Sequence, residues 1–141
     1  MIDASAIAKF MSNLSQEQFK IIAHLVLSEC FSQKLLDVDG KGDGGTDFSL
    51  FGNPKSESRI ALQTTIQDSG WKTKAYNHAK KAKKDLKADR FYFITNRIHE
   101  YRALVDIENK IDSELGIPAK CLGGREVAGL LIEFGLLSKF A

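Results

Sequence analysis

The chain has 141 residues, of which 43% are hydrophobic and 27% are charged, with a formal net charge of +2 at pH 7. These values suit one globular domain, residues 1–141, with one hydrophobic core. No apolar stretch approaches the roughly 20 residues of a membrane span, and the start of the chain lacks the basic region of a signal peptide. We therefore expect a cytoplasmic protein that does not associate with membranes. In that compartment Cys30 and Cys121 are expected to be reduced thiols.

In the first half, two helices and a β-hairpin are predicted. Ser15 and Gln18 form a capping-box pattern that opens a helix over residues 15–31, and a shorter helix precedes it over residues 4–14. The alternating segments "TDFSLFG" and "RIALQTTIQ" predict two strands around the turn "GNPKSES". In the second strand Ile60, Leu62, Thr64 and Ile66 share one face and Ala61, Gln63 and Thr65 share the other. Asp47 and Gln63 are then expected to come close on neighbouring strands.

The second half alternates helix and strand. A helix over residues 71–87 is expected, capped by Asp68 or Ser69. Trp71 is expected on its apolar stripe, packed in the core. A strand over residues 90–96, a helix ended by Gly116, a short strand within "IPAKCLG" and a last helix within "GREVAGLLIEFGLL" follow. This order predicts an α/β sandwich, a mixed sheet with helices on both faces.

The glycine-rich stretch "DVDGKGDGGTDFSLFG" resembles a calcium loop only in part. Asp37, Asp39 and Gly42 suit positions 1, 3 and 6 of an EF-hand loop. Position 5 is Lys41 and position 12 is Phe48, which supply no carboxylate. Calcium sensing is thereby excluded. The remaining interpretations are an acidic turn that reverses the chain and the approach to a site that the following strands complete.

"GGTDF", "RIALQTTIQ" and "FYFITN", in this order, resemble the core of the PD-(D/E)xK nuclease superfamily in its Mrr-like restriction-endonuclease branch. The resemblance implies a restriction-endonuclease-like αβββαβ core, with Asp47 as the acid and Gln63 in the Glu/Gln position. The start "DSGWKTK" of the next helix is similar to N-terminal nuclease effector domains of bacterial antiphage proteins, including those fused to STAND NTPases. The likeness implies an effector domain joined to a larger sensor, and a homo-oligomer.

Two positions depart from the family pattern. Thr65 stands where the catalytic lysine is expected, and Lys20 stands where the first helix often has a glutamate. Either the lysine role has moved, with Lys72 and Lys74 as candidates, or activity is altered or lost. Glu17 or Glu29 could replace the helical acid, but about three turns of helix separate them.

The resemblance implies hydrolysis of DNA phosphodiesters with Mg²⁺ or Mn²⁺ as the cofactor. The expected metal ligands are Asp47, the amide oxygen of Gln63, the backbone carbonyl of Thr64, and Asp43. The catalytic set adds Lys72 and Lys74, which would orient water and stabilise charge on the phosphate. The expected contacts to the DNA backbone are Lys72, Lys74, Lys80, Lys81 and Lys84.

Two alternatives remain open. The lysines of residues 71–87 can instead form a solvated face, with Asp85 as the one acid among them. The chain can also be a catalytically inactive nuclease-like module that binds nucleic acid or a partner protein, or a purely structural interaction domain. The substitution at Thr65 favours the inactive module.

Overall fold

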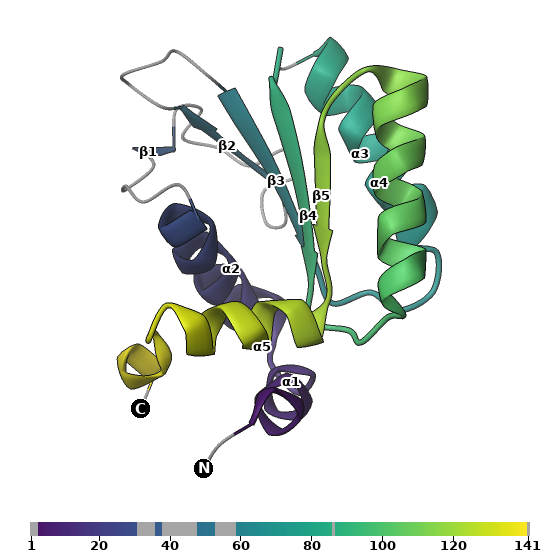
Figure 1. Cartoon of the computed structure of the whole chain (residues 1–141). Coiled ribbons are helices and arrows are strands. Elements are labelled where there is room, and N and C mark those ends of the chain that lie inside the picture. Colours follow the sequence, from purple (N-terminus) through teal and green to yellow (C-terminus); the bar gives the residue numbers. More distant parts are fainter. Residues whose placement is uncertain (1–2, 31–35, 38–47, 53–58, 86, 141) are drawn as a thin grey trace.

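The computed structural model describes residues 3–30, 36–37, 48–52, 59–85 and 87–140. Its elements, in chain order, are α1 (Ala4–Met11), α2 (Gln16–Cys30), β1 (Leu36–Asp37), β2 (Phe48–Gly52), β3 (Arg59–Thr65), α3 (Trp71–Lys84), β4 (Arg90–Thr95), α4 (Tyr101–Leu115), β5 (Ala119–Leu122), α5 (Gly124–Glu133) and the 3-10 helix η1 (Leu137–Phe140). Figure 1 shows these elements around a single sheet.

The sheet is mixed, as predicted, and its strands lie in the order β1-β2-β3-β4-β5. β2 and β3 form the expected antiparallel hairpin, in which Phe48 pairs with Gln63. β1 adds a two-residue antiparallel strand beside β2. β3, β4 and β5 run parallel, with Gln63 beside Phe93 of β4. The parallel strands therefore end together at one edge of the sheet, which is the lower edge in Figure 1.

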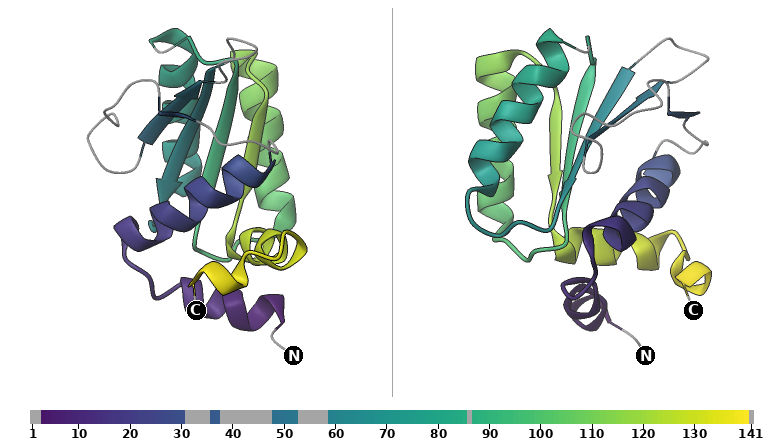
Figure 2. Two further views of the ribbon diagram at one scale, coloured as in Figure 1. Left: turned by 90° about the vertical axis from the view of Figure 1, so that its left-hand side faces the viewer. Right: turned by 180° about the vertical axis from the view of Figure 1, so that it is seen from behind.

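Helices cover both faces of the sheet. α3 and α4 pack on one face, and α2 and α5 lie on the other, as the two views of Figure 2 show. α1 packs against α5 below the sheet. Ile60 and Leu62 of β3 belong to the core beneath α2 and α5, whereas Ala61 belongs to the core beneath α3 and α4. The period-2 alternation predicted for this strand is confirmed, so Gln63 and Thr65 are on the strand positions that face α3 and α4.

The observed ends of three helices can be compared with the predicted ones. The capping box of α2 is confirmed, because Gln18 Oε1 accepts from the Ser15 amide at 3.0 Å and Ser15 Oγ accepts from the Gln18 amide at 3.2 Å. The predicted end of α4 at Gly116 is also confirmed, with φ of 69°. The predicted cap of α3 at Asp68 or Ser69 is wrong, since the residue at that position is Gly70 with φ of 72° and no side-chain cap.

The predicted end of α3 at residue 87 is also wrong. The helix stops at Lys84 rather than at residue 87. Lys87 takes a left-handed conformation with φ of 56°, and the Ala88 amide then donates to the carbonyl of Ala82 at 2.9 Å. The sequence does not indicate the end of α3 at Lys84, because no glycine or proline follows it closely and lysine itself is a good helix former.

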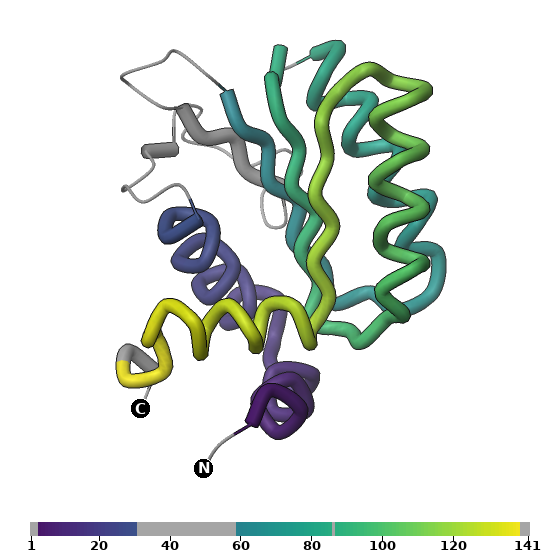
Figure 3. Tube along the Cα trace, viewed as in Figure 1, coloured from purple at the N-terminus to yellow at the C-terminus, as the bar shows by residue number. Residues whose placement is uncertain are grey.

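No helix within the described ranges has the length and apolar character to cross a membrane. The tube in Figure 3 shows how the first and last helices meet on one side of the molecule. Ile7 of α1 and Val127 of α5 share one core cluster. α1 is thereby packed against α5, although more than 100 residues separate them in the chain.

Candidate functional site

Gln63 is buried in the middle layer of the molecule, on β3 between Phe48 of β2 and Phe93 of β4. Its Nε2 donates to the carbonyl oxygen of Thr64 at 2.8 Å. Its Oε1 is buried and accepts no hydrogen bond from the described residues. A buried acceptor without a partner costs about 1–3 kcal/mol. The position therefore holds a neutral oxygen acceptor that is buried and makes no hydrogen bond within the described residues.

Thr64 faces the other side of the sheet, where it meets the first turn of α2. Gln16 Nε2 donates to the Thr64 carbonyl at 3.0 Å and lies 3.0 Å from the Thr64 hydroxyl. The carbonyl that was expected to bind metal thus accepts two amide groups, from Gln16 and from Gln63. Because a carbonyl oxygen has two lone pairs, a cation there would have to displace one of these donors. Sequence reasoning missed Gln16, whose one signal was a polar residue opening an amphipathic helix.

Thr65 occupies the position of the expected lysine. It is buried, and its hydroxyl accepts from the Gln67 amide at 3.0 Å, which shapes the turn into α3. Its side chain is a short, neutral structural group. The lysine chemistry of the family pattern is therefore absent at this position.

The first turn of α3 covers the face of the sheet that Gln63 faces. Trp71 is buried, as predicted, and stacks on Phe93 with 5.9 Å between ring centroids. The Lys72 ammonium lies 5.8 Å from the centroid of the Trp71 ring and is exposed. Lys74 is half-buried in the same turn. Both candidate lysines therefore belong to the first turn of the helix that covers this face of the sheet, and their catalytic role stays a prediction.

Asp47 and Asp43 lie outside the described residues. The nearest described position is Phe48, which follows Asp47 in the chain and pairs with Gln63. In the part of the chain that the structure describes, no group of three or more His, Cys, Asp and Glu side chains could hold a metal ion. The carboxylates of the expected site remain predictions.

The two candidates for the helical acid are separated by the structure. α2 meets β3 through its first turn, where Gln16 contacts Thr64, and Glu17 is exposed in that turn. Glu29 lies twelve positions later, about 18 Å along the helix. There, burial first and then the charges of Glu133 and Glu29 raise the pKa of Cys30. Glu17 is therefore the acid of α2 on the turn that meets the candidate site.

His99 lies beside this turn of α3, and no sequence pattern connects it with residues of β3. Its ring stacks on Trp71 at 4.4 Å and an angle of 22°. Its Nε2 is buried and accepts or donates no hydrogen bond among the described residues. Burial lowers the pKa of His99, and the charges of Lys72 and Arg97 lower it further against the opposing effects of Asp68 and Glu126. The imidazole is therefore neutral at neutral pH.

Asn96 ends the strand segment "FYFITN" and is buried. Its Nδ2 donates to the carbonyl of Met11 in α1 at 2.9 Å, while its Oδ1 has no hydrogen-bond partner among the described residues. The next residue, Arg97, donates from Nε to the carbonyl of Ile66 at 2.7 Å. These contacts tie the end of β4 to α1 and to the turn after β3, which fixes the edge where Gln63 lies.

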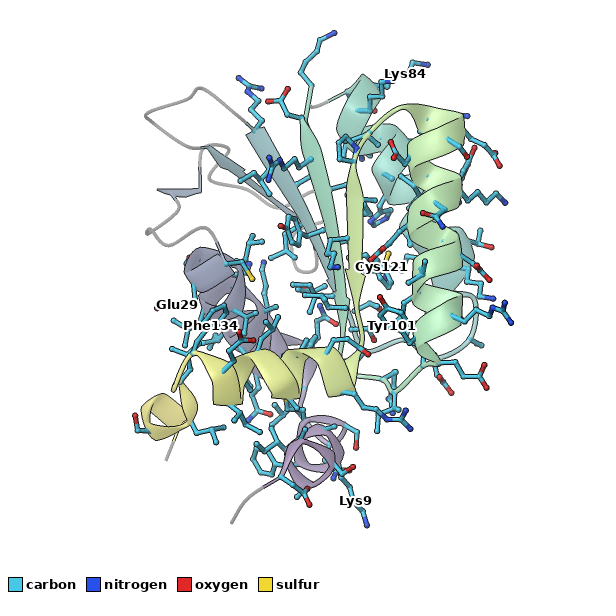
Figure 4. The ribbon with its side chains drawn as sticks, in the orientation of Figure 1. Lys9, Glu29, Lys84, Tyr101, Cys121 and Phe134 are labelled. Atoms are coloured by element: carbon cyan, nitrogen blue, oxygen red, sulfur yellow. The ribbon has the colours of Figure 1, made fainter. Side chains whose placement is uncertain are left out.

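The predicted DNA-contacting lysines fall into two separate groups. α3 has 14 residues and is therefore about 21 Å long. Lys72 and Lys74 lie in its first turn, at the carboxyl edge of the parallel strands. Lys80, Lys81 and Lys84 lie in its second half, and Figure 4 shows Lys84 at the top of the molecule, far above Tyr101 at the start of α4. One phosphate group cannot contact both groups.

No protein-family model, curated protein or solved structure matches the chain. The mixed α/β fold and the surroundings of Gln63 are therefore the observations on which a function can be built. The likeness to PD-(D/E)xK nucleases rests on the sequence motifs alone.

Proposed function

We propose that this chain is a metal-dependent DNA endonuclease domain of the PD-(D/E)xK, Mrr-like type. One observation carries the proposal: the Gln63 side chain is buried and its Oε1 has no hydrogen-bond partner among the described residues. Burying a polar atom without compensation is unfavourable, and a hard divalent cation binds amide oxygens of this kind. Phe48, the strand partner of Gln63, directly follows Asp47, which would add the carboxylate.

The residues of the site divide into ligands and supporting groups. Asp47, Asp43 and Gln63 Oε1 would hold Mg²⁺ or Mn²⁺, and the Thr64 carbonyl would join them if one of its two amide donors moved away. The bound ion would polarise the phosphate and lower the pKa of its water. Lys72 and Lys74 would orient the attacking water and stabilise charge on the phosphate. Gln16 holds the Thr64 main chain in place from the opposite face of the sheet.

The same resemblance supports a biological setting. The domain would act as an antiphage effector in the cytoplasm, as the N-terminal part of a longer protein with a sensor NTPase, and as a homo-oligomer able to cut both strands. Its DNA contacts would be to the phosphate backbone and would carry no direct sequence information.

Plasmid cleavage tests the proposal. The wild-type protein should convert supercoiled plasmid to nicked and linear forms with Mg²⁺ or Mn²⁺ and should stop when EDTA is added. Asp47→Ala should abolish cutting. Asp106→Ala, on the exposed surface of α4, is the matched control and should cut like the wild type. Equal cutting by the wild type and Asp47→Ala would refute the site assignment.

The second candidate function is an inactive nuclease-like module that binds nucleic acid or a partner protein. It is favoured by Thr65, which is buried and hydrogen-bonded where the family has its lysine. Such a module would bind DNA without metal, with an affinity that falls steeply as salt rises, and it would not cut plasmid in Mn²⁺.

A further inference from the structure

A cavity lies between the end of α3 and the end of α4, away from the candidate metal site. Its volume is about 340 Å³, and it is lined by Lys80, Lys83, Lys84, Lys87 and Leu115. We call it the lysine cavity. Four of its five lining residues are cations, and the lining that the structure describes includes no carboxylate. The size is at the lower end of the roughly 300–1,000 Å³ typical of small-ligand sites.

One of the four lysines is fixed in position by the end of α4. The Lys83 ammonium donates to the carbonyl of Leu115, in the last turn of that helix, where the dipole favours a cation. Gly116 makes room for this contact, because a Cβ at Gly116 would come 2.8 Å from Lys83 Nζ. Lys83 is therefore a rigid part of the cavity wall.

The other three ammonium groups of the lysine cavity are not held by a hydrogen bond of this kind. Lys80, Lys84 and Lys87 make no hydrogen bond or ion pair within the described residues. On α3, Lys80 lies three positions before Lys83 and four before Lys84, and these spacings bring like charges together on the helix surface, which is unfavourable. Glu114, the acid next to Leu115, accepts a hydrogen bond from the Tyr76 hydroxyl at 3.1 Å. One lysine would suffice to cap α4, so the other charges need a different explanation.

Lys87 strengthens this argument through its backbone. Its φ of 56° is in the left-handed region, where glycine is the least strained residue. A glycine would make the same turn without strain but would remove a charge from the cavity. Strained conformations of this kind concentrate at functional sites.

We propose that the lysine cavity is a binding site for two linked phosphate groups. Their charge matches the four ammonium groups, and the fixed Lys83 offers a preorganised first contact. The phosphates could belong to a free polyphosphate compound or to consecutive positions of a nucleic-acid backbone. The site is separate from the metal site, since α3 spans about 21 Å between them, and it does not depend on nuclease activity.

Inorganic pyrophosphate, titrated calorimetrically into the full chain without divalent metal, tests the proposal. Wild type should bind, and Lys80→Gln with Lys84→Gln should weaken binding by about tenfold or more, as expected for losing charge-assisted contacts. The control is the double variant Lys9→Gln with Lys20→Gln, which changes the net charge equally on α1 and α2. It should bind like the wild type. No binding by the wild type, or equal weakening in both double variants, would overturn the proposal.

A labelled DNA duplex in EDTA then distinguishes the two sources. If pyrophosphate displaces the duplex, and if Lys80→Gln with Lys84→Gln lowers the magnitude of the salt slope of DNA binding by about 2, the cavity takes backbone phosphates. If pyrophosphate binds and DNA binding is unaffected by either change, the cavity takes a free phosphate compound. Asp47→Ala should bind pyrophosphate like the wild type, which separates this test from that of the nuclease site.

Discussion

Gln63 uses its amide nitrogen to hold the carbonyl of the next residue, Thr64, at 2.8 Å, and it leaves its own carbonyl oxygen buried beside that contact. The hydrogen bond restrains the side chain. The free oxygen is then a fixed acceptor in a site from which water is excluded. A buried amide whose oxygen has no hydrogen-bond partner is expected to have a functional role. An apolar side chain of similar size would fill the same core position without the cost of burying an unpaired acceptor.

Gln63→Met tests this interpretation. The variant loses the hydrogen bond to Thr64 but also removes the buried acceptor, so its free energy of unfolding should stay within about 1 kcal/mol of the wild type. Plasmid cutting should fall by more than the roughly 10–100-fold that loss of an outer-shell group causes. Gln63→Glu is the matched variant, and it should retain cutting and bind Mn²⁺ more tightly because it adds a carboxylate. Strong destabilisation of Gln63→Met would show that the amide is structural.

Gln16→Ala should destabilise the protein by about 1–2 kcal/mol, because it removes both contacts from Gln16 Nε2 to Thr64. Urea unfolding followed by circular dichroism measures this change. Glu17→Ala, at the next, exposed position of α2, should stay within about 0.5 kcal/mol. If the two variants were equally stable, the contact between α2 and β3 would contribute little to the fold.

His99 should make stability depend on pH in the mildly acidic range. Its pKa in the folded protein is lowered, mainly by burial, so below about pH 6.5 the unfolded chain binds more protons than the folded one. The stabilisation is complete above that pH and is lost as the pH falls toward the folded pKa. His99→Phe keeps a ring on Trp71 and should lose this part of the dependence. Urea unfolding of both proteins from pH 7.5 to pH 5 gives the difference, and parallel curves would contradict the prediction.

Lys87→Gly should raise the free energy of unfolding by about 0.5–1 kcal/mol, because glycine adopts the left-handed conformation of this residue without a Cβ clash. The same variant should bind pyrophosphate more weakly. Thermal and urea unfolding measure the first effect and calorimetry the second. Lys84→Gly, inside the last turn of α3, is the opposite control and should destabilise by about 1 kcal/mol.

Local patterns predicted much of this fold because the forces involved are local. The alternation of Ile60, Ala61 and Leu62 anticipates which face of β3 each side chain occupies. Ser15 with Gln18, and Gly116 alone, anticipate the ends of α2 and α4. These features depend on neighbours a few positions away, which the sequence shows directly.

The wrong or missing predictions concern positions whose conformation depends on contacts between distant segments. Lys87 turns out of the helix although lysine is a good helix former, and α3 begins after Gly70, which provides no side-chain cap. The stacking of His99 on Trp71 joins the loop after β4 to the first residue of α3. Contacts between distant segments of this kind have no periodic signature in the sequence.

The packing of α1 against α5 has a consequence for how the protein is made. α1 is synthesised well before its packing partner α5, since Ile7 and Met11 share a cluster with Val127 and Leu131. At typical rates of synthesis, α1 must wait roughly ten seconds for that partner. Throughout that interval the apolar side of α1 lacks the surface that covers it in the folded protein. The packing of α1 is therefore expected to be a late step in the folding of this domain, because it must follow the synthesis of α5.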